Sequence, residues 1–330
     1  MNVSPRRTGR SILVGMLALM LMGLVGPAAT TSSAATVTQT TTMSALTFQD
    51  NMRKLWEDHV TWTRLYIVSA VAGLPETDAT TQRLLDNQTD LGNAIKPYYG
   101  EAAGDQLTAL LKDHILGAAA VLTAAKAGDT AGVKSASDEW YANADDIAIF
   151  LNGANPNAWP LDTLKMDMKM HLDQTLTEAV DHLQGNYAAD VADYDIVHNH
   201  ILAMADTISA GIISQFPDRF TALPSAAEVS LHLTMRKLWE DHVTWTRLFI
   251  VSASAGLPDL DATTQRLLAN QTDLGNAVKA YYGDAAGTQL TALLRDHILG
   301  AAAVLTAAKA GDTAGLKAAS DKWYANANDI

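Results

Sequence analysis

The sequence predicts an all-α protein made of tandem antiparallel helical-hairpin bundles, and three observations favour this fold class. Alanine- and leucine-rich segments place apolar residues every three or four positions, the period of a helix with one buried face. Runs of β-branched residues are short, and the few prolines stand mostly between the periodic segments. A long segment of the sequence also occurs twice, which is typical of a repeated architecture.

Six helices are expected between residues 46 and 220. The periodic segments cover residues 48–73, 80–99, 102–127, 130–151, 161–184 and 188–216. Four breaks between them supply a glycine for a left-handed cap, a proline, or an N-capping side chain. These breaks are Gly73-Leu74-Pro75, Gly128-Asp129-Thr130, residues 152–160 and Gly185-Asn186. Connections this short force neighbouring helices to run antiparallel, which predicts a six-helix unit of three αα-hairpins.

The second unit is predicted from the repeat. Residues 52–147 recur as residues 235–330 at a constant offset of 183, with 82 of 96 positions identical. We therefore expect a linker over residues 221–228 and a truncated four-helix unit over residues 229–330, which repeats the first two hairpins. Because a third hairpin is missing from this unit, we expect it to expose an apolar groove. Such a unit is either less stable or borrows a partner surface.

The N-terminal segment, residues 1–35, is predicted to be a signal peptide. Three arginines precede the apolar residues 12–25, and small residues follow. This apolar stretch is shorter than the roughly 20 residues needed to span a bilayer, so we expect no stable membrane span after signal cleavage. Residues 36–45 are rich in threonine and are expected to form a flexible leader. The protein is therefore expected to be secreted or extracytoplasmic.

Charge and cysteine content narrow the classes of partner. The formal net charge is −13 at pH 7, and loss of the three signal-peptide arginines makes it about −16 (−13 − 3). An acidic surface argues against a nucleic-acid partner, because binding to phosphates needs basic side chains. The chain has no cysteine, so disulfides and thiol catalysis are excluded and stability must come from a packed core.

The candidate site residues are histidines and aspartates that recur once in each hairpin. His59, His114 and His171 lie near the middle of odd-numbered helices, about 14 residues before each hairpin turn. Asp90, Asp146 and Asp206 lie on the returning helices at a similar height. The second unit repeats the pattern with His242, Asp273, His297 and Asp329.

Two interpretations of these residues remain open. In the first, each buried histidine donates a hydrogen bond to an aspartate of its own hairpin and fixes the register of the two helices. In the second, the histidines and aspartates of the bundle bind a divalent metal. The Glu-x-x-His pairs of di-iron bundles are absent, so the sequence favours the structural interpretation.

No catalytic residue is predicted. The chain has no Gly-x-Ser-x-Gly elbow, no His-Glu-x-x-His motif, no phosphate-binding Gly-x-x-x-x-Gly-Lys loop and no dinucleotide fingerprint. We therefore expect a non-enzymatic binding or structural module that recognises an unknown protein or cell-surface partner. The alternative is a metal-binding protein or metal-dependent enzyme that uses the histidines and aspartates of the bundle.

Several segments also resemble a known family. They are Leu-Trp-Glu-Asp-His-Val-Thr-Trp-Thr-Arg from Leu55, Gly-Leu-Pro at Gly73, Asp-His at Asp113, Trp-Tyr-Ala-Asn-Ala-Asp at Trp140, His-Leu-Asp-Gln-Thr at His171 and Met-Ala-Asp at Met204. Together they resemble a family of uncharacterised exported bacterial all-helical proteins, over nearly all of residues 52–220 and 235–330. Members similar to this chain often carry the label acetylglutamate kinase or glycosyltransferase. The resemblance implies the helical fold, whereas those activities need an α/β scaffold and phosphate-binding loops that this sequence lacks.

Overall fold

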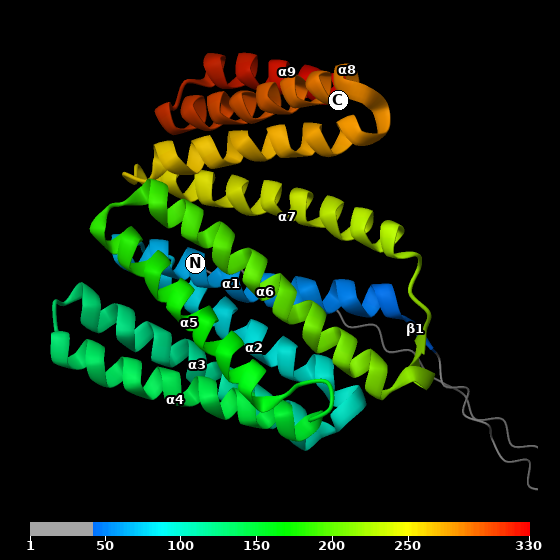
Figure 1. The fold of residues 1–330 in the computed structure, drawn as a ribbon. Helices are drawn as coiled ribbons and strands as arrows, with labels where there is room; N and C mark the ends of the chain where they lie inside the picture. Colours follow the sequence, from blue (N-terminus) through cyan, green and yellow to red (C-terminus); the bar gives the residue numbers. More distant parts are fainter. Residues whose placement is uncertain (1–41) are drawn as a thin grey trace, which may run out of the picture. The chain divides into compact units, whose positions relative to one another are not determined.

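The structure is a computed structural model that describes residues 42–330 (Figure 1). The predicted signal peptide and most of the predicted leader lie outside the described residues. Within the described part the fold is all-α, with nine helices and one pair of two-residue strands, so the predicted all-α class is confirmed. The described residues 42–330 belong to one compact unit.

The first six helices form a closed ring. They are α1 (Ala45–Ala72), α2 (Thr77–Tyr99), α3 (Glu101–Lys126), α4 (Thr130–Ala154), α5 (Leu161–Gln184) and α6 (Tyr187–Gln215). Each begins and ends within three residues of the segment expected from the sequence. Every helix packs against the next one along the chain, and α6 returns to pack against α1. The three hairpins therefore surround a common interior.

Three further helices follow: α7 (Ala226–Ala255), α8 (Leu260–Ala310) and α9 (Thr313–Asp329). Helix α8 is two helices joined at Gly283, whose φ of 86° and ψ of 167° are not helical. Gly100 has nearly the same angles, φ 85° and ψ 168°, between α2 and α3. Only glycine adopts this backbone conformation readily, so the same break occurs in both copies of the sequence. Figure 1 shows α7 to α9 in yellow to red, with α7 beside α1, α8 in contact with α6, and α9 packed against α8.

Two boundaries differ from the prediction. Helix α7 begins at Ala226, inside the predicted linker, because Ser225 and Glu228 form a capping box that starts the helix earlier. Strand β1 (Met43–Ser44) falls within the predicted leader and pairs in parallel with β2 (Phe220–Thr221), which follows a short 3₁₀ helix, η1 (Pro217–Arg219). Periodicity does not reveal two-residue strands, since alternation needs at least four residues to be recognised.

Among the described helices, α3, α6 and α8 are long and apolar enough to cross a bilayer by length and composition. No membrane forms part of the structure, and these helices also supply buried residues to the protein core.

Candidate metal centre

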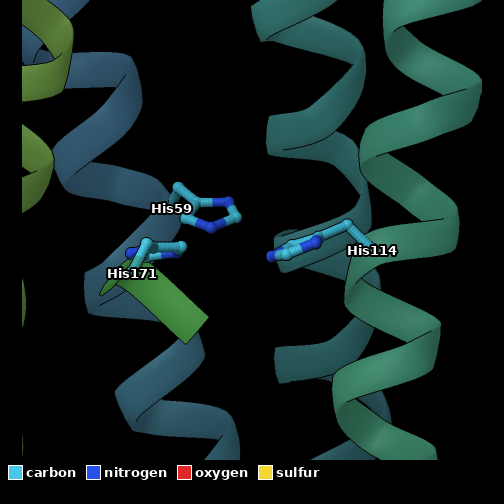
Figure 2. A group of neighbouring side chains, drawn as sticks. All are labelled: His59, His114 and His171. Carbon is cyan, nitrogen blue, oxygen red and sulfur yellow. The ribbon is translucent and has the colours of Figure 1, made fainter. Parts of the chain in front are cut away.

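Three histidines meet in the interior of the six-helix ring. His59 comes from α1, His114 from α3 and His171 from α5, and one ring nitrogen of each lies within 4.8 Å of the other two. Figure 2 shows the ring of His114 pointing toward those of His59 and His171. All three side chains are buried. Among the described residues this is the one group of three or more histidine, cysteine or acidic side chains close enough to share a metal ion.

Helical spacing explains why each histidine points inward. The residue three positions before each histidine and the residue one position after it are buried and apolar, so the histidine lies on the buried face of its helix. These residues are Trp56 and Val60, Leu111 and Ile115, and Met168 and Leu172. The tryptophan ring centroid of Trp56 lies 5.9 Å from that of His59, so the site has an apolar wall.

A side-chain amide fixes the tautomer of His59. Its Nδ1–H donates to Oε1 of Gln88 at 3.2 Å, since a carbonyl oxygen only accepts. Gln88 is itself oriented, because its Nε2 donates to the carbonyl oxygen of Leu84 at 2.7 Å. The proton therefore stays on Nδ1, and Nε2 keeps a lone pair that is available to a ligand.

His114 has the same arrangement. Its Nδ1–H donates to Oδ1 of Asn143 at 3.2 Å, and Nδ2 of Asn143 donates to the carbonyl oxygen of Leu110 at 3.0 Å. Nε2 of His114 is therefore also available. In metalloproteins the non-coordinating N–H of a metal-ligating histidine almost always donates to an oxygen that orients the ring, and here a side-chain amide supplies that oxygen.

The third hairpin differs in its supporting residue. His200 occupies the position where the other hairpins have an amide, and its ring stacks on that of His171 with centroids 6.2 Å apart. Nε2 of His200 contacts the carbonyl oxygen of Asp167 at 3.0 Å, as the amide of Asn143 contacts Leu110. Nδ1 of His171 has no hydrogen-bond partner among the described residues. A buried polar atom without a partner is a feature that a bound ligand would explain.

Sequence analysis missed these supporting residues, although a signal was present. Gln88, Asn143 and His200 each lie 29 residues after the histidine that they support. In the second copy a side-chain amide again lies 29 residues after each histidine, where His242 binds Gln271 and His297 binds Asn326. A constant spacing between polar residues on paired helices would have identified the contact.

Burial keeps the three imidazoles neutral. Desolvation lowers the pKa of His59 to about 4, and its hydrogen bond to Oε1 of Gln88 only partly opposes this. Desolvation, with repulsion from His59, lowers the pKa of His114 to about 3. The pKa of His171 is lowered well below its usual value by desolvation and by the neighbouring imidazoles. Neutral imidazole is the form that binds metal ions.

The predicted aspartate partners do not reach the histidines, so the His–Asp pairs are wrong. Asp90 is exposed and lies 3.9 Å from Arg83, and Asp146 is exposed to solvent. Asp206 instead binds Arg53 at 2.7 Å. An aspartate at the same distance from the turn as a histidine does not contact it when its side chain lies on another side of its helix.

No protein-family model, curated protein or solved structure matches this chain. The chemistry of the site must therefore be argued from its own atoms. Three neutral imidazoles with no carboxylate suit zinc, copper or nickel, and do not suit magnesium or calcium, which prefer oxygen ligands. Nitrogens around a tetrahedral zinc lie about 3.4 Å apart, given Zn–N distances of about 2.0–2.1 Å.

The second copy holds only part of this site. His242 and His297 keep their amide partners, at 3.2 and 3.0 Å, but the described residues bring no third histidine to them. The predicted aspartate partners do not contact the histidines of the second copy either. Asp273 lies 3.9 Å from Arg266, and Asp329 is exposed.

Proposed function

We propose that this chain is an exported, non-enzymatic helical protein that binds one divalent transition-metal ion through His59, His114 and His171. Zinc fits the ligand set best among common biological metals that need no redox chemistry. The observation that carries the proposal is the convergence of three neutral ring nitrogens within 4.8 Å in a buried interior. The metal would join the three hairpins of the ring at one point.

The free energy of burial supports this proposal. A neutral imidazole has one donor and one acceptor nitrogen, and the donors of His59 and His114 are already used by amides. Leaving a buried acceptor without a partner costs roughly 1–3 kcal/mol. Among the ring nitrogens of the three histidines, Nδ1 of His171 is the one that is buried without a hydrogen-bond partner in the described residues, and coordination to a shared cation would give it one. The burial of the rings argues against catalysis, because a substrate has no direct access to them.

A purely structural role is the second candidate. His242 and His297 make the same amide contacts in the second copy, where the described residues supply no third ligand. The histidine–amide pair therefore fixes the packing of two helices without a metal. On this alternative, the convergence of the three rings is a consequence of repeating that pair three times.

Metal analysis of the full chain separates the two candidates. Protein purified without a histidine tag and stripped with a chelator is titrated with Zn²⁺, and bound zinc is counted by native mass spectrometry. We expect one zinc per chain, lost in His114→Ala and retained in His297→Ala, its counterpart 183 residues later with the same type of amide partner. Metal-free wild-type protein, or equal zinc in both variants, would leave only the structural role.

Export is part of the proposal and rests on the N-terminal sequence. Arginines, an apolar stretch and small residues occur there in the order typical of a signal peptide. N-terminal sequencing of the mature protein should find a start just after Ala28 or Ala35. A mature protein that retains Met1 would contradict this part.

A further inference from the structure

Helix α6 lies against one side of α1, which we call the inner flank of α1. Five side chains of α1 contact α6 through hydrogen bonds or close ion pairs, with donor and acceptor atoms 2.6–3.0 Å apart. The contacts are Gln49 and Arg53 with Asp206, Glu57 with His198, Thr61 with Tyr194, and Arg64 with Asp190. The inner flank of α1 therefore binds an acidic helix through specific polar contacts.

Helix α6 also packs against the outer face of α7 and α8, formed by Asp241, Trp245 and Arg266, and its Tyr194 and His198 contact both this face and the inner flank of α1. Oδ1 of Asp241 lies 3.1 Å from Nδ1 of His198. Trp245 packs edge-on against Tyr194 with ring centroids 5.5 Å apart, and Arg266 binds Asp195 through two contacts of 2.6 and 3.0 Å. Helix α6 is thus held between the inner flank of α1 and the outer face of the second copy.

A groove of about 1170 Å³ also lies between α7 and α1, and its walls repeat those that hold α6. One wall consists of the residues that stand 183 positions after the inner flank of α1, namely His232, Arg236, Glu240, Thr244 and Arg247. The other wall includes Lys54, Asp58 and Trp62, which stand 183 positions before Lys237, Asp241 and Trp245. Most residues of the two walls that hold α6 therefore recur around an open groove, although His232 stands at the position of Gln49, and Arg83, the counterpart of Arg266, does not line it.

The groove exposes residues whose sequence equivalents are buried. Trp56 is 5 % exposed, whereas its counterpart Trp239 is 42 % exposed. Val60 is 3 % exposed, whereas Val243 is 65 % exposed. The sequences around these residues are identical, so the difference comes from the neighbours: α5 and α6 cover the first copy, and the described residues contain no counterpart of this hairpin in the second. Exposed apolar surface of this kind is typical of an interaction site.

We propose that the α7–α1 groove binds an amphipathic acidic helix of the α6 type, carried on a helical hairpin of another polypeptide. Its apolar side would cover Trp239 and Val243, as the third hairpin covers Trp56 and Val60. The groove is lined by carboxylates as well as cations, namely Glu57, Asp58, Glu228 and Glu240 beside Lys54, Arg236 and Arg247, so Arg247 alone sets where a carboxylate of the partner would bind. Arg64 binds two carboxylates, one from α5 and one from α6, whereas its counterpart Arg247 is exposed and forms no ion pair among the described residues.

A second copy of this chain does not fit the groove. Its own α6 is already held between α1 and α7 by fully buried residues, Tyr194 and His198 among them. If two grooves instead met face to face, Arg247 of each copy would approach a like charge. A separate acidic hairpin avoids both difficulties because it brings a free helix and carboxylates to Arg247.

The hairpin of this chain itself is the natural probe. A fluorescent peptide of residues 161–216, which spans α5 and α6, is titrated with the full-length protein in the presence of a chelator, and binding is followed by anisotropy. We expect saturable binding that Arg247→Glu and Val243→Asp each weaken at least tenfold. Leu116→Asp, at a residue of α3 that is similarly exposed but lies outside the groove, should bind as the wild type does.

A charge exchange shows whether the peptide occupies the predicted position. Asp190→Lys in the peptide should weaken binding to the wild type and restore at least part of the binding to Arg247→Glu, because the two charges are then reversed together. Three results would overturn the proposal: no binding to the wild type, equal binding to Arg247→Glu, or a concentration-dependent dimer of the free chain in which Trp239 becomes buried. The last result would assign the groove to a second copy.

The same hairpin would extend the metal site, a step that rests on the proposed function. A hairpin seated as α5 and α6 are would bring its own His171 toward His242 and His297, so bound zinc should rise from one to two per chain when the peptide is present. A peptide with His171→Ala should bind without adding zinc. Peptide binding is measured in chelator, so failure of the zinc count and failure of docking are separate results.

Discussion

The ring of His59 lies 5.6 Å from that of His171, although α1 and α5 are the first and fifth helices of the chain. His114 lies 6.1 Å from both rings. Three positions that are far apart in the sequence therefore form one buried site, because the hairpins close into a ring. The amides of Gln88 and Asn143 determine which nitrogen His59 and His114 offer to a ligand.

Gln88→Leu should weaken zinc binding about 10- to 100-fold, the usual effect of removing a residue that orients a metal-ligating histidine. Without the amide, the proton of His59 is no longer held on Nδ1 and the ring can rotate. The measurement is a competition titration of zinc against a chromophoric chelator. Gln271→Leu is the matched control, since Gln271 makes the equivalent contact with His242 at the same distance of 3.2 Å. Equal affinities for the two variants would show that the amide does not act on the metal.

Arg64→Met should lower the free energy of unfolding by about 3–5 kcal/mol, the typical cost of removing one partner of a buried ion pair. Arg64 is buried, and its loss leaves the carboxylates of Glu178 and Asp190 without their cation. The free energies of unfolding of Arg64→Met and of the control Arg247→Met are measured by urea unfolding and compared with that of the wild type. Arg247→Met, at the exposed counterpart, should change the stability by less than about 0.5 kcal/mol. Equal effects would mean that the cluster around Arg64 contributes no more than a surface residue.

Glu178 should make stability depend on pH between pH 5 and pH 7. Burial raises its pKa from 4.5 to about 7, because Arg64 is shared with Asp190 and only partly offsets the loss of water. In this window the folded chain keeps a proton that the unfolded chain has lost, so the contribution of Glu178 to stability falls as the pH rises. Glu178→Gln removes this contribution, and its stability relative to the wild type should increase by on the order of 3 kcal/mol between pH 5 and pH 8. A constant difference across this range would show that Glu178 does not bind a proton on folding.

Gly211→Ala should destabilise the protein by roughly 1–3 kcal/mol, the usual cost of overpacking. A Cβ at Gly211 would lie 2.2 Å from Nε1 of Trp159, which is buried and donates to the carbonyl oxygen of Thr207. Gly153→Ala is the control, because a Cβ there meets no atom within 4 Å and alanine favours a helix. Thermal unfolding should therefore rank the variants with Gly153→Ala at or above the wild type. A Gly211→Ala protein as stable as the wild type would mean that Trp159 has room to move.

Local pattern was enough to predict the helices and the inward direction of the histidines. Apolar residues recur at helical spacing, and caps such as Asp129 mark helix starts, so the six segments matched the structure closely. Convergence of His59, His114 and His171 was not predictable in this way, since it depends on α6 packing against α1 and closing the ring. Sequence periodicity describes one helix at a time and does not report such closure.

A matching distance from the hairpin turn does not bring the aspartates into contact with the histidines. Asp90 was chosen because its distance from the turn matches that of His59, but it lies two residues after Gln88 on the same helix. Two residues correspond to about 200° of rotation, so Asp90 points away from the side that faces His59. Gln88 was overlooked because glutamine is not a metal ligand of the usual kind, although it is well suited to orient one.

X-ray absorption spectroscopy of the zinc-loaded full chain tests the central claim most directly. We expect one zinc with three imidazole nitrogens at about 2.0–2.1 Å, and loss of this signature in His114→Ala but not in His297→Ala. A zinc surrounded only by oxygen ligands, or an imidazole signature that survives in His114→Ala, would contradict the claim that the three buried histidines form one metal site.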